Sequence, residues 1–325
     1  MQKKSLIIII IIIMLGLSGW VIYLSQKISG HSDFKKCSDQ YPFISSELDC
    51  GNINEKIEQV EGIDDTIENF INQEEQAGNA KKVSVFFRDL NTRRWFGVNE
   101  NVNFYPASLA KLPIAMMTYK SAEINKKILE AELPITEEDA TLNTGQHYEV
   151  FQPLEAGKSY PVREQVRKML TYSDNAPVNP LMNASVLFRD AIFYDLGVFY
   201  PPSNGEKSGQ WNISAKSYAN LFRVLYNASY LRPEYSNEIL KFLSESTFNN
   251  ALPAGTAYGT KVAHKYGETA YADEEIGETL TILNDCGIIY KKDAPYVLCV
   301  MTQGQKFEEL ERIIQHISET VYNSL

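Results

Sequence analysis

The order of β-rich and helical segments along the chain constrains its fold more than any other feature. Two short β-rich runs, 81–90 and 93–100, are separated only by Asn91 and Thr92 and predict a hairpin. A long stretch with mostly helical character follows, from about 108 to 250. β-Rich character then returns in three runs, at 260–268, 278–290 and 295–303. Strands therefore stand at both ends of a helical middle.

Amphipathic helices are expected before the first strands and after the last. In 53–76 and in 306–325, apolar residues recur at steps of three and four. Strands from both ends of the chain can join one antiparallel sheet, with the terminal helices packed on one face. The sequence thus predicts an α+β fold: an antiparallel β-sheet flanked by terminal helices, plus an all-helical lobe. A pocket is expected between the two lobes.

The first 24 residues predict a membrane anchor. The 19 residues of 6–24 carry no charge, and as a helix they would rise about 28 Å, close to the hydrocarbon thickness of a bilayer. Lys3 and Lys4 precede them, which predicts a cytoplasmic amino terminus and everything that follows outside the membrane. The alternative is a cleaved signal peptide, with 16–19 as its small-residue site. Polar residues 25–52 predict a tether, and 53–325 the folded domain.

Charge and cysteine content exclude several classes of function. The net charge is −10 and no dense basic run follows the amino-terminal lysines, which argues against nucleic acid as a partner. The cysteines and histidines show no metal-site spacing, so we expect neither metal nor cofactor. An exported chain permits disulfides. Cys286 and Cys299 lie in two runs joined by the turn 291–295, and Cys37 and Cys50 lie in the tether; each pair is either a bridge or two free thiols.

The stretch "YPASLAKLPIAM", 105–116, places Ser108 three residues before Lys111 at the head of an apolar run. This spacing alone is weak, because it arises by chance in a chain of this length, and Ser32 and Lys35 match it as well. Placement is the stronger argument: on a helix the two side chains share one face, and the helix amino terminus favours developing negative charge. The alternative is a helix-capping serine and a solvated lysine.

Two further motifs follow in order. "YSDNA" places Ser173, Asp174 and Asn175 just after the expected helix 163–170, and "VAHKYGE" places Lys265 and Gly267 on an expected strand. Each alone has an ordinary structural explanation, as capping residues or as an edge lysine. All three together, in this order and with these flanking elements, resemble the serine β-lactamase-like and penicillin-binding protein family, most closely the class A β-lactamase catalytic domain. The resemblance covers about 55–325.

The resemblance implies a role for each motif residue. Ser108 would be the acylated nucleophile, and Ser173 the relay that carries a proton to the leaving nitrogen. Lys111 would be the base that takes the Ser108 proton, or would orient a water that takes it. Asn175 would bind the acylamido group of the substrate, and Lys265 would face its carboxylate. Asp174 would be buried and structural. Gly267 would leave room for the substrate, and the oxyanion hole would be formed by the backbone N–H groups of Ser108 and Glu268.

Two departures from the family pattern affect the expected activity. Tyr266 stands where the family has Thr or Ser, whose hydroxyl contacts the substrate carboxylate; a phenol either donates a hydrogen bond there or fills the site. The family's deacylating glutamate also has no clear counterpart. Glu206, four residues before Gln210, keeps a similar spacing, but an exposed polar loop explains it better; Asp195 is a weaker candidate still.

The expected function is therefore that of a serine acyl-enzyme hydrolase that opens β-lactam amides through an ester on Ser108. A D-alanyl-D-alanine peptidase, or a slow penicillin-binding protein, is the first alternative, because both kinds of substrate share a carboxylate and an amide. The second is a non-catalytic cell-wall-binding module, which Tyr266 favours and the otherwise intact motif set opposes. The expected partners are a β-lactam or a peptidoglycan peptide, and the membrane through the amino-terminal helix.

Overall fold

The computed structural model describes residue 43 and residues 62–185, 195–197, 212–273 and 277–325. The expected anchor 1–24, almost all of the tether with Cys37 and Cys50, and the candidate Glu206 lie outside these residues. The helix expected from residue 53 is described from Ile63 onward. Within the described residues, no helix combines the length and the apolar character needed to cross a bilayer.

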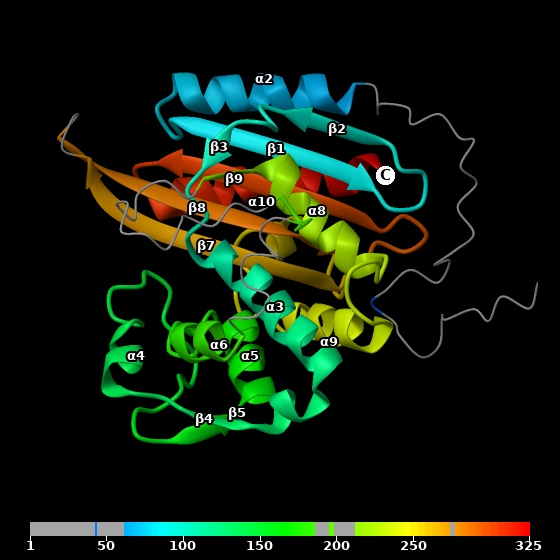
Figure 1. The fold of residues 1–325 in the computed structure, drawn as a ribbon. Helices are drawn as coiled ribbons and strands as arrows, with labels where there is room; N and C mark the ends of the chain where they lie inside the picture. The colour runs from blue at the N-terminus through cyan, green and yellow to red at the C-terminus, as the bar shows by residue number, and fades with distance from the viewer. Residues whose placement is uncertain (1–42, 44–61, 186–194, 198–211, 274–276) are drawn as a thin grey trace, which may run out of the picture.

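A five-stranded antiparallel sheet forms the upper lobe in Figure 1. Its strands run in the order β2-β1-β9-β8-β7. The sequence's two groups of β-rich runs therefore meet in one sheet, where β1 from the first group pairs with β9 from the second. The bounds are β1 Lys82–Asp89, β2 Trp95–Val98, β7 Val262–Asp273, β8 Glu278–Ile289 and β9 Tyr296–Gly304. The α+β prediction is confirmed.

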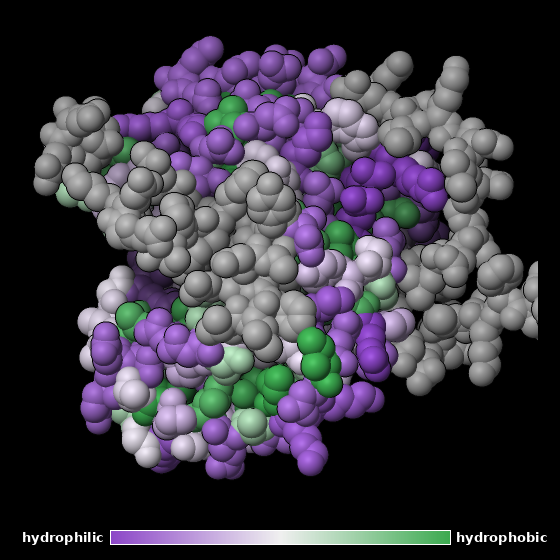
Figure 2. All heavy atoms as spheres, viewed as in Figure 1, coloured by the Kyte–Doolittle hydropathy of each residue, from purple (hydrophilic) through white to green (hydrophobic). Residues whose placement is uncertain are grey.

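Helices cover both faces of the sheet. The terminal helices α2 (Ile63–Gln76) and α10 (Phe307–Ser324) pack on one face, where their apolar side chains form a shared core with the sheet. Helix α8 (Ala215–Tyr226) packs on the other face, against β9, β8 and β1. The outward surface around α2 is strongly hydrophilic (Figure 2), as expected for an amphipathic helix with a single buried stripe.

The second lobe lies below the sheet in Figure 1 and is mostly helical. Its central helix α3 is buried on nearly all sides, as expected for a helix enclosed by others. Its elements are α3 Lys111–Ile124, η3 Lys126–Glu130, α4 Glu137–Thr141, α5 Val162–Thr171, α6 Val178–Ala184 and α9 Pro233–Ser244. The 3-10 turn η5 (Leu252–Gly255) leads from this lobe back to the sheet and packs on α10.

The expectation of an all-helical lobe needs one correction. Short strands β4 (Glu132–Pro134) and β5 (Ser159–Pro161) pair within it. A second small pair, β3 (Asn103–Phe104) with β6 (Ile213–Ser214), lies at the junction with the sheet. Segments of two or three residues are too short for a period-two pattern to show in the sequence, so hydrophobic periodicity could not reveal them.

The carboxyl-terminal hairpin carries a disulfide. Cys286 on β8 lies directly opposite Cys299 on β9 and is bonded to it. This confirms the bridge that the sequence left as one of two alternatives. Both sulfurs are buried on the sheet face that packs against the helical lobe. The bridge therefore joins two central strands within the core.

Candidate active site

Ser108 lies where the two lobes meet, on the 3-10 turn η2 (Ala107–Ala110) that leads directly into α3. The sequence predicted a helix beginning at Ser108; the structure has a 3-10 turn there, and the α-helix begins at Lys111. Residues three apart on a 3-10 turn lie one above the other, so the shared face expected for the two side chains is retained. The turn is tied down by Tyr218 of α8, whose hydroxyl donates to the Leu109 carbonyl at 2.8 Å.

Ser173 joins the two lysines of the motifs. Lys111 Nζ donates to Ser173 Oγ at 3.0 Å and to the Ser173 carbonyl at 2.5 Å. Lys265 Nζ, from β7, donates to the same Oγ at 3.0 Å. Ser173 follows α5 with a positive φ of 57°, a conformation uncommon for a residue other than glycine. The structure thus brings together three residues that stand 62 and 92 positions apart in the chain.

Burial decides the protonation of these lysines. Lys111 is 3% exposed and Lys265 is fully buried. Burial holds the pKa of Lys111 well below its ordinary value, and the nearby Lys265 lowers it further. Burial also lowers the pKa of Lys265, to about 7, against the opposing influence of Asp285 and Glu268. Burial therefore favours the free-amine form of Lys111, which is the form that accepts a proton.

Asp174 and Asn175 organise the loop beside the site. The buried Asp174 carboxylate accepts from Asn143 Nδ2 at 2.7 Å and from the Leu154 N–H at 2.8 Å. Asn175 donates from Nδ2 to the Leu142 carbonyl at 2.7 Å, and its backbone N–H donates to Asn143 Oδ1, also at 2.7 Å. Asn143 thus contacts both residues, although the sequence marks it only as an asparagine in a polar loop.

Gly267 is pressed against the turn that carries Ser108. A Cβ added at this glycine would lie 2.5 Å from the Pro106 carbonyl oxygen and 3.1 Å from the Ser108 nitrogen. Only glycine allows β7 to approach the turn so closely. A cavity of about 260 Å³ opens here, and it is lined by Ser108, Lys111, Asn175 and Glu268 together with neighbours on η2, α3 and β7.

Tyr266 fills the space beside Ser173 with an aromatic ring. The ring is only 4% exposed, stacks on Phe248 at a centroid distance of 4.2 Å, and meets Tyr148 edge-on at 5.7 Å. Lys265 Nζ lies 4.1 Å from its centroid. Burial raises the pKa of the phenol, while a hydrogen bond with Ser173 acts in the opposite direction. The phenol therefore keeps its proton and stands as a neutral polar group next to Ser173.

Glu268 has a side-chain role that the sequence did not suggest. Its carboxylate accepts from the His147 N–H at 2.9 Å, which links β7 to the loop following α4. Burial raises its pKa, against hydrogen bonds from the backbone of His147 and Tyr148. The sequence analysis assigned only the backbone of Glu268; no pattern indicates which way a strand-edge carboxylate points.

Asp195 is paired with Tyr230. The Tyr230 hydroxyl donates to Asp195 at 3.4 Å, and the Tyr230 carbonyl accepts from Lys120 near the carboxyl end of α3. Asp195 is not among the described residues that line the Ser108 cavity. Across the described ranges, no group of three or more His, Cys, Asp or Glu side chains could hold a metal ion.

A protein-family model for the β-lactamase enzyme family matches residues 63–325. The chain belongs to this family. The match begins at the first residue of α2 and spans both lobes and all three motifs. No curated protein matches the chain.

Solved structures with low sequence identity share the fold. A mutant of PBP-A, in an acyl-enzyme complex with penicillin G, superposes with a TM-score of 0.68 at 19% identity, over 82% of this chain and 97% of that one. A β-lactamase from Chitinophaga pinensis gives 0.66 at 19% identity, over 80% and 99%. One from Xanthomonas campestris gives 0.64 at 19% identity, over 81% and 99%. Two β-lactamases and PBP-A are thus similar to this chain in fold.

Proposed function

We propose that the protein is a serine acyl-transfer enzyme that opens β-lactam amides and holds the product as an ester on Ser108. The observation that carries the proposal is the Ser173 hydroxyl, which lies 3.0 Å from both Lys111 Nζ and Lys265 Nζ beside the cavity of Ser108. A scaffold would need neither buried lysine, since burying an ammonium group costs free energy.

Acylation can be written with these residues alone. The Lys111 amine takes the proton from Ser108 Oγ, which attacks the carbonyl carbon of the lactam. The backbone N–H groups of Ser108 and Glu268 donate to the oxygen as it gains negative charge. The carbon–nitrogen bond then breaks, and the nitrogen receives the hydroxyl proton of Ser173. Ser173 is reprotonated by the Lys111 ammonium, so the proton taken from Ser108 ends on the leaving nitrogen.

Deacylation distinguishes a lactamase from a slow penicillin-binding protein, the second candidate. Glu268 is the one carboxylate among the described residues that line the Ser108 cavity, and its side chain is occupied with the His147 N–H. Asp195, the weaker candidate from the sequence, accepts from Tyr230 and is not among the described residues that line this cavity. These positions support an ester that persists. The same acyl chemistry would serve for a D-alanyl-D-alanine peptide.

The test is the intact mass of the full-length protein after incubation with a penicillin, beside Ser108→Ala. An adduct of one penicillin on the native protein and none on the variant would support the proposal, and its lifetime would separate the two candidates. Drug hydrolysis that depends on Ser108, without a lasting adduct, would favour the lactamase. Neither adduct nor hydrolysis, with a folded native protein, would reject β-lactam chemistry and leave the peptidase or the binding module.

A further inference from the structure

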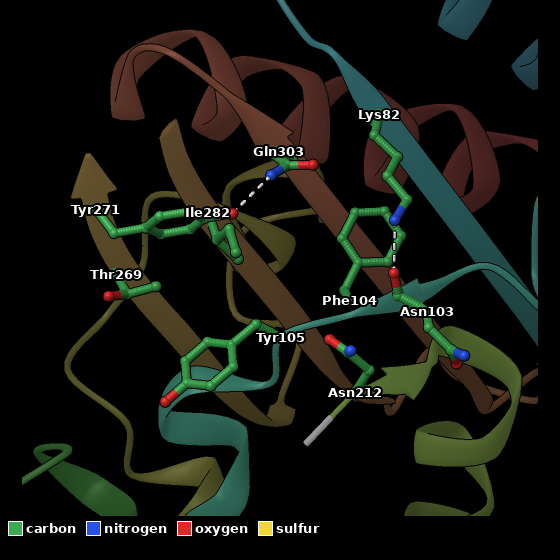
Figure 3. Close-up of a pocket in the computed structure, with 9 residues that line it drawn as sticks. All are labelled: Lys82, Asn103, Phe104, Tyr105, Asn212, Thr269, Tyr271, Ile282 and Gln303. Carbon is green, nitrogen blue, oxygen red and sulfur yellow. Dashed lines mark hydrogen bonds between the residues drawn. The ribbon is translucent and has the colours of Figure 1, made fainter. Parts of the chain in front are cut away.

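A second and larger cavity, of about 580 Å³, lies on the sheet face that looks toward the helical lobe (Figure 3). Its floor is a row of four residues in direct register across four strands. Lys82 on β1 is paired with Gln303 on β9, which is paired with Ile282 on β8, which is paired with Thr269 on β7. Its volume is within the usual range for a small-molecule site.

The walls of this cavity are polar and aromatic. They are formed by Asn103 and Phe104 of β3, by Tyr105, by Tyr271 farther along β7, and by Asn212. Gln303 Nε2 donates to the Tyr271 hydroxyl at 3.1 Å, so the floor and one wall are joined (Figure 3). Amides, hydroxyls and flat apolar faces together suit a ligand that has both hydrogen-bonding groups and carbon surface.

Lys82 gives the cavity its charge. It is the only charged side chain among the described lining residues, in a protein whose net charge is −10. Its ammonium donates to the Asn103 carbonyl at 2.6 Å and lies 4.3 Å above the Phe104 ring. No carboxylate of the described residues pairs with it. An ammonium has three hydrogens to donate, so Lys82 can still receive an anionic group.

The cavity adjoins the one at Ser108, and Tyr105 and Thr269 line both. Its position along β7 shows which part of a substrate it faces. Lys265, Gly267, Thr269 and Tyr271 share one face of the strand, since side chains alternate. Lys265 contacts the relay Ser173, which serves the leaving nitrogen; Thr269 and Tyr271 lie beyond Gly267, in the opposite direction. The cavity therefore lies on the acyl side of Ser108.

We propose that this cavity is a second subsite, which holds the far end of the acyl donor's side chain and selects chains that end in a carboxylate through Lys82. The inference rests on the proposed acyl-transfer function. It names the class of donor: an amide-bearing chain, extended enough to pass Tyr105 and Thr269 and anionic at its end. A peptide with a side-chain or terminal carboxylate has this chemistry.

The experiment uses two penicillins with the same nucleus and side chains of equal length, one ending in a carboxylate and the other in the corresponding primary amide. Acylation rate constants are measured on the full-length protein by intact mass. The native protein should react about tenfold faster with the carboxylate probe, as expected for one charge-assisted hydrogen bond. Lys82→Gln should reduce this ratio to about one, and Lys82→Arg should retain most of it.

Lys81→Gln is the matched control. Lys81 is the neighbouring residue, but it pairs with Glu278 at 2.5 Å and does not line the cavity. It should keep the native ratio, which separates a local contact from the general loss of one positive charge. Equal rates for the two probes on the native protein, or a ratio that Lys82→Gln leaves unchanged, would overturn the subsite.

Equilibrium binding separates failure of the subsite from failure of the proposed chemistry. Titration calorimetry of both probes on Ser108→Ala measures binding whether or not Ser108 is a nucleophile. Tighter binding of the carboxylate probe, lost when Lys82→Gln is added, would support the subsite even if the native protein formed no ester. No difference between the probes in this background would reject the subsite and leave the acylation result to stand on its own.

Discussion

At the scale of single residues, the site depends on a buried lysine whose charge is lost near neutral pH. Burial lowers the pKa of Lys265 to about 7, so its protonated fraction falls as the pH rises through that value. If its charge faces the substrate carboxylate, acylation by a penicillin should slow above about pH 7. In Lys265→Arg the side chain stays charged at every pH of the assay. The decline in the acylation rate should therefore move to higher pH.

The shape of the pH profile is the measurement, because arginine in a fully buried position is expected to change the absolute rate as well. Rate constants for acylation are followed from pH 5 to pH 10 by adduct mass. The control is an acylating reagent that has no carboxylate, because its reaction does not depend on a positive charge at Lys265. The same descending limb in Lys265→Arg as in the native protein would assign the titration to another group.

Gly267 is a second residue with a specific consequence. A Cβ there would lie 2.5 Å from one backbone atom of the Ser108 turn and 2.9 Å from another, so the turn or the strand must move. Gly267→Ala should lower the free energy of unfolding by about 1–3 kcal/mol. It should also slow acylation about a hundredfold, because small displacements of reacting groups strongly reduce the rate. Thermal unfolding and adduct formation are measured side by side.

Gly78→Ala provides the comparison for Gly267→Ala. Gly78 has a positive φ of 77° and open space around its Cβ position, so alanine should lower stability through backbone strain alone. Acylation should remain near the native rate in that variant. If both variants lose reactivity in proportion to their loss of stability, the close approach of β7 to Ser108 has no special role.

At the scale of secondary-structure elements, the sequence predicted what is long and periodic. The five strands of the sheet and the amphipathic α10 overlap the runs that the patterns predict. Strand β7 continues to Asp273, beyond the predicted end at 268, and β2 has only four residues, Trp95–Val98. The paired strands β4 and β5 were missed because they have three residues each. The structure brings Lys111 and Lys265 to Ser173, as the family resemblance implied. The distances between these side chains could not be predicted, because they depend on packing between the lobes.

Side-chain direction at the edge of the sheet was beyond prediction. Hydrogen-bond donation from Tyr266 to a substrate carboxylate stays a prediction; in the structure the ring packs on Phe248, and the phenol interacts with Ser173. The row from Lys82 to Thr269 depends on strand register, which no single segment encodes. The amide of Asn143 was missed because its partners, Asp174 and Asn175, are distant in sequence.

The β8–β9 hairpin makes a prediction at this scale. The Cys286–Cys299 bridge spans 13 residues, and closing a loop of that size stabilises a fold by about 3 kcal/mol. Replacing both cysteines by alanine should lower the unfolding free energy by about that amount. Acylation should be little changed at temperatures where the variant remains folded, since neither sulfur lines the Ser108 cavity.

Denaturant unfolding with and without reductant checks this prediction on the native protein as well. Reduction should destabilise the native protein and leave the double variant unaffected. Equal unfolding midpoints for the native protein under both conditions would mean that the bridge is absent in solution or adds no stability. A large loss of acylation in a folded double variant would show instead that the hairpin positions β7.

At the scale of the whole molecule, the position of the tether limits how far the domain can lie from a membrane. Phe43 is attached to the domain: its N–H donates to Asn237 Oδ1 at 3.2 Å, and its carbonyl accepts from the Tyr290 hydroxyl at 2.7 Å. Residues 25–42 precede it, and 18 residues span at most about 65 Å. If 6–24 is an anchor, Phe43 lies within about 65 Å of the outer face of the membrane.

The anchor itself is testable by fractionation and mass together. We propose that the full-length protein stays in the membrane fraction after alkaline carbonate washing, because 19 uncharged residues partition strongly into a bilayer. Deletion of 1–24 should release a soluble domain that still acylates, since the catalytic motifs all lie within residues 63–325. A native protein in the soluble fraction, whose mass shows that its chain begins after residue 19, would instead establish a cleaved signal peptide. The limit of about 65 Å set by the tether would then not apply.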